Sequence, residues 1–250
     1  MSSVILSNDF SIENVSFSQP RKNNMGGISI LLNYLNNGKN GPLVIQTPKM
    51  RVPFGVDAQE PQEGVGPIKY SLNTSLAAND STNESLIKFT ESIRELDIFT
   101  KAKGVDSSEE WFGKKKSADV IDELFKSAEK KPKNDKYAST LKLKLPVRDG
   151  KPQFEVFDES KKSIQIINNN EIDLSGIEKG CEVIAIIQCT GIWFVGKTSF
   201  GIGWKIIQLK TYKQARLVGY SIIDDDPDDE EDGEEEEIVE EEEEEIVEAE

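Results

Sequence analysis

Alternating apolar and polar residues between residues 137 and 223 limit most strongly what this chain can fold into. In TLKLKLPVR (140–148), leucines alternate with Lys142 and Lys144. Successive side chains of a strand point to opposite faces, so this segment is expected to have one apolar and one cationic face. Further short runs follow at intervals of about 8–15 residues: QFEVFD, KKSIQIIN, CEVIAIIQC, IWFVGK, GWKIIQLKTY and LVGYSII. This spacing predicts a mainly β fold, an antiparallel barrel or a sandwich.

Two segments of helical periodicity interrupt the predicted strands. The first helix is predicted to begin near Ser81, because Ser81 and Glu84 have the spacing of a capping box, and to end near Lys103. The second is predicted from Ser117 to about Lys130. Their apolar residues recur at helical spacing: Leu86, Phe89, Ile93 and Leu96 in the first, and Ile121, Leu124, Phe125 and Ala128 in the second.

The charge of the chain is distributed very unevenly. The formal net charge is -16, yet residues 224–250 contain 6 Asp and 14 Glu and no Lys or Arg. The preceding residues carry 26 acidic against 30 basic side chains, a charge of about +4. A segment with so many like charges and so few apolar residues cannot collapse by itself. We therefore predict a folded domain, 1–223, with a helical insertion at about 81–130, followed by a disordered acidic tail, 224–250.

Histidine is absent from the chain, and only two cysteines occur, Cys181 and Cys189. Zinc fingers, histidine-based metal sites and imidazole-dependent catalytic triads are therefore excluded. We predict no metal or other cofactor and no enzymatic activity, and we expect both cysteines to be buried and reduced. The N-terminal segment MSSVILSNDFS lacks a basic region, and the longest apolar run, VIAII, is far below the roughly 20 residues of a membrane span. An intracellular location is expected.

The segment GIWFVGKT (191–198) fits the pattern of a phosphate-binding loop, G-x-x-x-x-G-K-[ST]. Such a loop needs compact residues around the phosphates and a helix directly after it. Here the four variable residues are bulky strand formers, and the following residues, SFGIGWKIIQLKTY, alternate as in a strand. We therefore interpret the region as a β-hairpin with its tip near TSFGIG, and not as a nucleotide site.

Aromatic and lysine side chains are concentrated in this predicted hairpin. Two of the three tryptophans, Trp193 and Trp204, occur there and are followed closely by lysines. Aromatic rings stack on unpaired bases while amines contact phosphates, so the combination favours a single-stranded nucleic-acid face. The alternative is that the rings form the core and the lysines are merely solvated. Simple alternation predicts that Trp204, Lys210 and Tyr212 share one face and that Lys205 is on the other.

These features together resemble the acidic-tailed single-stranded DNA-binding proteins of certain phages and of nucleocytoplasmic large DNA viruses. The resemblance is carried by GIEKGCEVIAIIQCTGIWFVGKTSFGIGWKIIQLKTY (176–212) and by the tail, and PLVIQTPKMRVPFGV (42–56) resembles a segment of the large-virus members. It implies an OB-fold-like antiparallel barrel that coats exposed single strands during viral DNA replication and recombination. The phage proteins end in an aromatic residue, whereas this chain ends in IVEAE, so a tail contact through a terminal ring is not expected.

By this resemblance, the partners are single-stranded DNA and, through the tail, replication proteins such as DNA polymerase. A homodimer is also compatible with it, and the location would be viral replication sites in the host cytoplasm or nucleus. The candidate residues for base stacking are Trp193, Phe200, Trp204 and Tyr212. The candidates for phosphate contacts are Lys49, Arg51, Lys142, Lys144, Lys197, Lys205 and Lys210. The candidates for partner binding in the tail are Asp224, Glu237, Ile238, Val239, Ile246 and Val247.

Two other functional classes are compatible with parts of this pattern. An acidic-tailed chaperone for basic proteins would account for the tail but not for the aromatic and lysine side chains of the hairpin. A structural virion or interaction protein would account for the β fold and would bind no oligonucleotide. In the leading hypothesis, the tail competes with single-stranded DNA for the basic groove of its own domain, because tethering gives it a high effective concentration.

Overall fold

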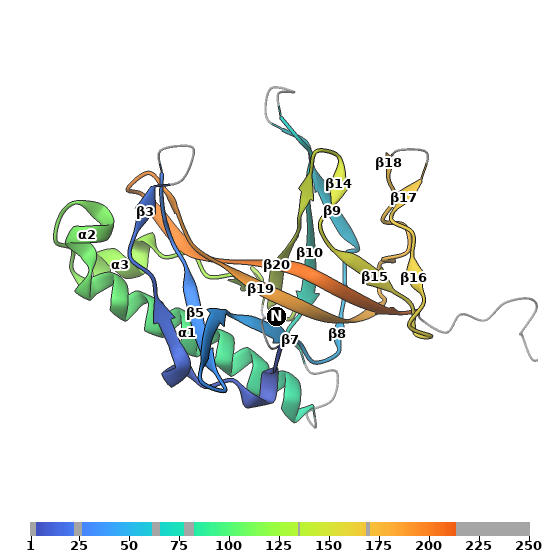
Figure 1. Cartoon of the computed structure of the whole chain (residues 1–250), viewed down its shortest axis with the longest axis horizontal. Helices are drawn as coiled ribbons and strands as arrows, with labels where there is room; N and C mark the ends of the chain where they lie inside the picture. The colour runs from blue at the N-terminus through green and yellow to red at the C-terminus, as the bar shows by residue number, and fades with distance from the viewer. Residues whose placement is uncertain are drawn as a thin grey trace, which may run out of the picture. The chain divides into compact units, whose positions relative to one another are not determined.

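Two long antiparallel strands organise the computed structural model (Figure 1). β19 (Glu182–Val195) and β20 (Ser199–Tyr212) pair along their length, and a turn at 196–198 joins them. The sequence that matches a phosphate loop therefore forms the end of β19 and the turn, and a strand follows it. The predicted hairpin is confirmed, but its turn precedes the predicted tip, because Gly201 and Gly203 lie within β20.

The structure describes residues 4–22, 27–61, 66–77, 83–134, 136–168 and 171–213. The chain divides into two units, Met1–Gln214 and Ala215–Glu250, and all described residues belong to the first. The predicted division between residues 223 and 224 therefore stays a prediction. The tail candidates lie outside the described residues: Asp224, Glu237, Ile238, Val239, Ile246 and Val247.

Thirteen of the described strands form one sheet around the hairpin. Its continuous path is β1-β7-β19-β20-β12-β10-β9, and β3, β4, β8, β11, β15 and β16 pair at its sides. The bounds on the path are Ile5–Leu6 (β1), Val44–Gln46 (β7), Thr140–Leu145 (β12), Lys69–Ser75 (β10) and Val56–Gln59 (β9). The bounds at the sides are Arg21–Lys22 (β3), Ile28–Ile30 (β4), Met50–Arg51 (β8), Glu129–Lys130 (β11), Glu155–Phe157 (β15) and Ser163–Ile164 (β16).

Smaller elements complete the described β structure. One sheet of three strands has the order β2-β5-β6, and two further sheets are the pairs β13-β14 and β17-β18. Asn37 and Gly38 connect β5 to β6 with positive φ angles of 49° and 74°, as the twist of a tight hairpin requires. The bounds are Val15–Phe17 (β2), Leu32–Asn36 (β5), Lys39–Pro42 (β6), Val147–Arg148 (β13), Lys151–Pro152 (β14), Ile167–Asn168 (β17) and Glu171–Ile172 (β18). Two 3-10 turns are η1 (Ser7–Asp9) and η2 (Ile12–Asn14).

The predicted mainly β fold is confirmed, whereas the closed antiparallel barrel is not found among the described strands. The path of the main sheet is open between β1 and β9, and the pairs β1-β7, β12-β20 and β15-β20 are parallel. β12 meets β20 at a single residue pair, Lys144 with Lys205, so the two strands diverge beyond it. The sheets are consistent with an OB-like fold that is not closed into a barrel among the described strands.

Three α-helices, not the predicted two, occur between β10 and β11: α1 (Glu84–Asp106), α2 (Ser108–Phe112) and α3 (Ala118–Leu124). The first begins later than predicted because Asn83 caps it, its side chain accepting a hydrogen bond from the Leu86 N–H at 3.1 Å. The predicted apolar stripe of α1 is confirmed, since Leu86, Phe89, Ile93 and Leu96 are all buried. α3 ends six residues before the predicted Lys130, because Phe125 is extended.

An aromatic cluster attaches the helices to the tip half of the hairpin. Trp111 and Phe112 of α2 contact Phe194 of β19 and Phe200 of β20 at ring-centroid distances of 5.3–6.2 Å. Phe125, directly after α3, contacts the Phe200 ring at 5.2 Å. Edge-to-face arrangements of this kind add to the free energy gained from burial. The cluster therefore fixes the position of the helical insertion on the sheet.

β-bulges change which side chains of the hairpin share a face. The register shifts where Ile186 pairs with Gln208 but Ile187 pairs with Ile206, so Ile207 is an extra residue on β20. Lys205, Lys210 and Tyr212 therefore lie on the same face, and Trp204 lies on the opposite, buried face. The prediction that Trp204 is in phase with Lys210 and Tyr212 is wrong, because alternation does not continue through a bulge.

Polar side chains connect α1 to the segment before β12. The Ser127 hydroxyl donates a hydrogen bond to the buried carboxylate of Asp97. Arg94 donates two hydrogen bonds, of 2.8 and 2.7 Å, to Glu129, which also accepts one from Ser139 at 2.7 Å. Burial raises the pKa of Asp97 to about 6, whereas the hydrogen bond from Arg94 lowers the pKa of Glu129.

The raised pKa of Asp97 predicts a stability difference that depends on pH. The folded chain holds this proton up to a pH of about 6, whereas the unfolded chain loses it near the ordinary value of 3.8. The stabilisation by the protonated carboxyl is therefore complete below pH 3.8 and is lost as the pH rises through about 6. Relative to Asp97→Asn, the natural chain should lose roughly 3 kcal/mol of unfolding free energy across this window. Urea unfolding of both chains at pH steps measures it, and a constant difference would contradict the assignment.

Candidate nucleic-acid interface

Lysines from three adjacent strands occupy one face of the main sheet. Strand pairing places Lys144 of β12 beside Lys205 of β20 on one side and beside Ser71 of β10 on the other. Lys142 and Lys69 follow on the same face by alternation, while the leucines of β12 are buried on the opposite face. The cationic face predicted for 140–148 is thus confirmed. We refer to Lys69, Lys142, Lys144 and Lys205 as the lysine face.

The amines of the lysine face repel one another. The pKa of Lys144 is lowered, first by its burial away from water and then by the positive charges of Lys142 and Lys69. Asp57 faces this region from β9, where it accepts a hydrogen bond from the Ser71 hydroxyl at 3.3 Å. Among the described residues, none of the four lysines forms an ion pair. An incoming anion would therefore relieve the repulsion.

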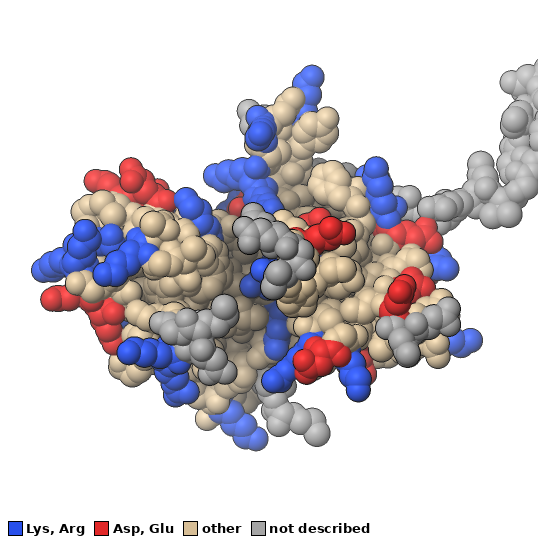
Figure 2. Space-filling view, turned by 90° about the horizontal axis from the view of Figure 1, so that it is seen from above, with Lys and Arg blue, Asp and Glu red and all other residues tan. Residues whose placement is uncertain are grey.

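A cavity of about 380 Å³ opens where β12 and β20 diverge. Four lysines and one partly exposed aromatic ring, that of Trp193, contribute to its wall, which contains no acidic side chain. The lining residues are Lys126, Ser127, Ala128, Lys130, Lys142, Lys144, Trp193, Ile202, Gly203 and Trp204. A view of the described residues from above shows lysine and arginine side chains in several separate groups, with fewer groups of acidic side chains between them (Figure 2).

Two glycines of β20 form the floor beneath the Trp193 ring. A Cβ atom at Gly201 would lie 2.8 Å from Cζ2 of Trp193, and one at Gly203 would lie 3.5 Å from Cδ1 of the same ring. The indole therefore lies across β20 against bare backbone, in a position that side chains at 201 and 203 would obstruct. One part of the ring packs against the strand, and the rest faces the lysine-lined cavity.

Residues 125–130, which we call the strap, form the second wall of the cavity. The backbone N–H of Lys126 donates to the carbonyl oxygen of Phe200 at 2.7 Å, and the backbone N–H of Lys142 donates to Ala128 at 3.2 Å. β11 within the strap pairs with β12. The Asp97 and Arg94 contacts described above hold the same segment to α1. Lys126 is thereby placed beside β20, with its amine donating to the Glu123 carbonyl oxygen at 2.9 Å, and Lys130 is placed in β11 beside β12.

The structure brings together only some of the residues predicted from the sequence. Lys142, Lys144 and Trp193 line the cavity, and Lys205 is the strand neighbour of Lys144. The prediction that Phe200 and Trp204 stack on bases is wrong. The two residues are only 0% and 2% exposed and belong to the hydrophobic core. Trp204 forms part of the inner cavity wall, but a ring buried to this degree has no face open to a base.

Another group of predicted DNA contacts lies around Tyr212, at the end of the hairpin far from its turn. Tyr212 has two amines over its ring, those of Lys49 at 4.0 Å and Lys210 at 4.9 Å. Lys49 also pairs with Glu182 at 3.0 Å, and strand pairing places Arg51 beside the same glutamate. This second group is distinct from the cavity and includes an acid.

Lys197 is exposed in the turn at the other end of the hairpin. Its amine lies 3.7 Å from where a Cβ atom of Gly113 would be, next to the end of α2. It is therefore not part of the cavity.

Lys126 and Lys130 are candidate contacts that the sequence analysis missed. Ile121, Leu124, Phe125 and Ala128 have helical spacing, which predicts both lysines on the outside of a helix. Their position depends on the bond between Lys126 and Phe200, which connects residues far apart in the chain. No local pattern contains this information.

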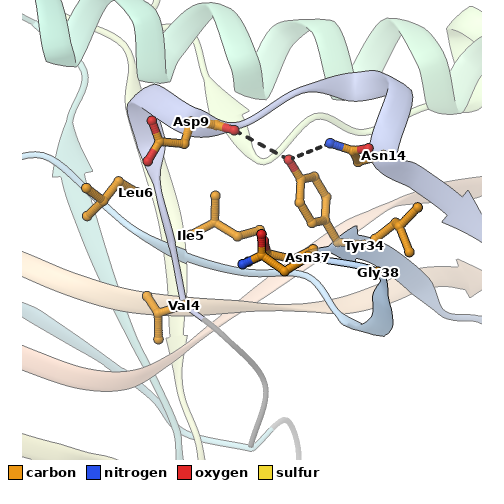
Figure 3. Close-up of a pocket in the computed structure, with 10 residues that line it drawn as sticks. Val4, Ile5, Leu6, Asp9, Asn14, Tyr34, Asn37 and Gly38 are labelled. Carbon is orange, nitrogen blue, oxygen red and sulfur yellow. Dashed lines mark hydrogen bonds between the residues drawn. The ribbon is translucent and has the colours of Figure 1, made fainter.

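Another cavity, near the N-terminal strands, differs in charge (Figure 3). Its volume is about 550 Å³, and its described lining contains Asp9 but no Lys or Arg. The Tyr34 hydroxyl accepts hydrogen bonds from the Ser11 N–H at 3.1 Å and the Asn14 amide at 3.3 Å. This cavity is therefore unsuited to phosphates.

Within the described ranges, no group of His, Cys, Asp or Glu side chains is arranged to hold a metal ion. The helices described here are all too short or too polar to cross a membrane.

The chain belongs to a protein family described as a family of unknown function, DUF5871, whose profile matches residues 75–229, more than half of the sequence. A comparison with curated protein sequences gives no match.

Among solved structures, the chain is similar to gp2.5, a single-stranded DNA-binding protein encoded by bacteriophage T7. The two share 11% sequence identity with a TM-score of 0.43, and the similarity covers 72% of this chain and 91% of the phage protein. The single-stranded DNA-binding protein of bacteriophage Enc34, in complex with single-stranded DNA, has 15% identity and a TM-score of 0.45. This similarity covers 83% of this chain and 99% of the Enc34 protein. Both are phage single-stranded DNA-binding proteins, whereas the resemblance to large-virus proteins stays a prediction.

The contact between the strap and β20 predicts a specific sensitivity at Gly201. A methyl group there would collide with the carbonyl oxygen of Lys126 and press on the Trp193 ring. Gly201→Ala should therefore lower the free energy of unfolding by about 1–3 kcal/mol. Gly41→Ala is the matched control, since a Cβ in that strand meets no atom within 4 Å. Urea unfolding compares them, and equal stability of the two variants would contradict the tight strap contact.

Proposed function

We propose that this chain is a sequence-tolerant single-stranded DNA-binding protein. The observation that carries the proposal is the cavity in which the partly exposed Trp193 ring faces four lysines and no acid. Stacking on an indole is open to any unpaired base, because every base has a π-face, while amines follow the backbone charge without regard to sequence. A duplex cannot offer its bases in this way, so the site favours single strands.

The geometry supports a path for the strand from Trp193 across the lysine face. One base would stack on the exposed part of the Trp193 ring, with its phosphate between Lys142 and the strap lysines. Neighbouring phosphates would then meet Lys144, Lys205 and Lys69, which continue across β20, β12 and β10. Each contact releases counterions, so binding should weaken steeply with salt.

The group around Tyr212 provides a second basic surface on the same hairpin face. Lys49 and Lys210 already occupy positions over its ring, so a base would have to displace an amine to stack there. We therefore assign Lys49, Arg51 and Lys210 to phosphate contacts and do not assign Tyr212 to stacking. Glu182 weakens the positive potential at this end, so we expect a smaller contribution to affinity.

The acidic tail is proposed to compete with DNA for the lysine face and to recruit replication proteins such as DNA polymerase. The 20 acids of residues 224–250 and the basic charge of the remaining chain support this role. A tethered polyanion acts at high effective concentration, so it excludes weak ligands and yields to one that also stacks. Action in viral DNA replication and recombination is proposed with it.

The test is tryptophan fluorescence of the full chain titrated with oligodeoxythymidine. Trp111 and Trp204 are buried, so quenching should come mainly from Trp193. Trp193→Ala should lower affinity by roughly 10- to 100-fold, the effect of removing one stacked base. Because the variant removes the reporting fluorophore, binding of labelled oligonucleotide is followed by anisotropy, and Trp193→Phe should retain most of the affinity.

Lysine substitutions test the electrostatic part of the site separately. Lys142→Ala combined with Lys144→Ala should reduce the slope of log affinity against log salt by about 1.4, because each amine that no longer neutralises a phosphate lowers it by about 0.7. Lys39→Ala combined with Lys151→Ala is the matched control, because both lysines are exposed and lie outside the lysine face. Equal slopes for the two double variants would exclude the lysine face as the phosphate site.

Absence of oligonucleotide binding at low salt would reject the proposed function. Tight binding of histones without oligonucleotide binding would instead identify the acidic-tailed chaperone. Stable assembly that is independent of nucleic acid would identify the structural protein.

A further inference from the structure

An apolar groove lies between α1 and α3, away from the lysine-lined cavity. Its volume is about 550 Å³. Ile98 and Ala102 of α1 and Ala118 of α3 are its exposed apolar residues, whereas Val105 is half-buried and Ile121 is buried beneath them. Ile98 is 64% exposed, which is high for an isoleucine in the middle of a long helix. The groove thus presents a small exposed apolar surface between the two helices, centred on Ile98.

α1 therefore carries two apolar stripes with different neighbours. Leu86, Phe89, Ile93 and Leu96 face the core of the folded part and are at most 2% exposed. The stripe of Ile98, Ala102 and Val105 lines the groove; Ile98 and Ala102 are exposed, and Val105 is half-buried against the core. A surface helix needs only the first stripe to pack on its domain. The second is available to another molecule.

Acidic side chains form the rim of the groove. Asp119, Asp122 and Glu123 of α3 face Lys101 of α1, which pairs with Asp122 at 2.6 Å. Among the described residues, Asp119 and Glu123 form no ion pair, although the Lys126 amine donates to the Glu123 carbonyl oxygen at 2.9 Å. A polyanion is therefore repelled here. The acidic tail of the same chain, whose apolar pairs Ile238-Val239 and Ile246-Val247 are flanked by glutamates, is repelled for the same reason.

We propose that this groove docks a basic amphipathic helix of a partner protein. Apolar side chains of that helix at i, i+3 or i+4, and i+7 would enter between Ile98 and Ala118, and lysines or arginines flanking them would meet Asp119 and Glu123. The combination of an apolar floor and an acidic rim selects this chemistry over nucleic acid, the tail, or an acidic partner. The inference is independent of the proposed DNA binding.

The probe is a fluorescein-labelled amphipathic peptide with leucines at i, i+3, i+4 and i+7 and lysines on both flanks. A peptide of the same composition in scrambled order controls for charge attraction to the acidic tail. A third peptide, with the sequence of residues 236–250, tests the tail as occupant. Fluorescence anisotropy with the full chain should show binding of the first peptide and much weaker binding of the other two.

Two matched substitutions on α1 test the location. Ile98→Ser should weaken binding of the basic amphipathic peptide about tenfold, because the peptide no longer buries an isoleucine side chain there. Ile87→Ser should leave the affinity unchanged, since Ile87 is 44% exposed on the same helix but outside the groove. Asp119→Asn combined with Glu123→Gln should also weaken binding, whereas Glu109→Gln combined with Glu110→Gln should not. Thermal unfolding of each variant verifies that the fold is retained.

Equal affinity of the Ile98→Ser and Ile87→Ser chains would overturn the proposal, as would equal binding of the scrambled peptide. Binding of the 236–250 peptide that depends on Ile98 would make the tail the occupant. Self-association of the full chain that disappears in Ile98→Ser, measured by light scattering, would make a second copy the occupant. Either of the last two results would overturn the proposal of a basic partner helix. The affinity for oligonucleotides is measured separately and does not depend on these outcomes.

Discussion

The close contact between the strap and β20 is the interaction on which the candidate interface depends. The Lys126 N–H bonds to Phe200 at 2.7 Å, and Gly201 has no side chain to keep the two segments apart. This bond and the packing of Phe125 on Phe200 end α3 and begin the extended course toward β11. Because the strap is held there, Lys126 and Lys130 line the cavity together with Lys142. Without this interaction, the cavity would lack one wall and half of its lysines.

The helical insertion separates two surfaces of opposite charge over a short stretch of chain. Glu123 lines the groove between α1 and α3, and Lys126 lines the cavity beside Trp193. Each surface combines an apolar or aromatic contact with one sign of charge, which is the basis for proposing a basic helix at the groove and a single strand of DNA at the cavity. The proposed competition between the acidic tail and DNA concerns the lysine-lined cavity and not the groove, because only the cavity has the opposite charge to the tail.

Much of the local structure could be predicted, but the composition of the site could be predicted only in part. Alternation indicated the cationic face of β12 and the strand character of the hairpin, and helical spacing indicated the buried stripe of α1. Strand alternation failed at Trp204, because the bulge at Ile207 puts Lys205 in phase with Lys210. The Trp204 indole is left on the opposite face, in the core. Helical spacing failed after Leu124, because a bond to a distant strand outweighed the local preference of the strap residues.

The sequence by itself determined the uneven charge, the absence of histidine chemistry, the strand character of the C-terminal half, and the failure of GIWFVGKT as a phosphate loop. These properties depend on composition or on residues adjacent in the chain. Only the tertiary structure decided that Trp193, and not Trp204, has an exposed ring, and that Lys126 and Lys130 join Lys142 and Lys144. These outcomes depend on bulges and on contacts between segments far apart in sequence, whose free energy is set by the packing of the whole domain and not by any local preference.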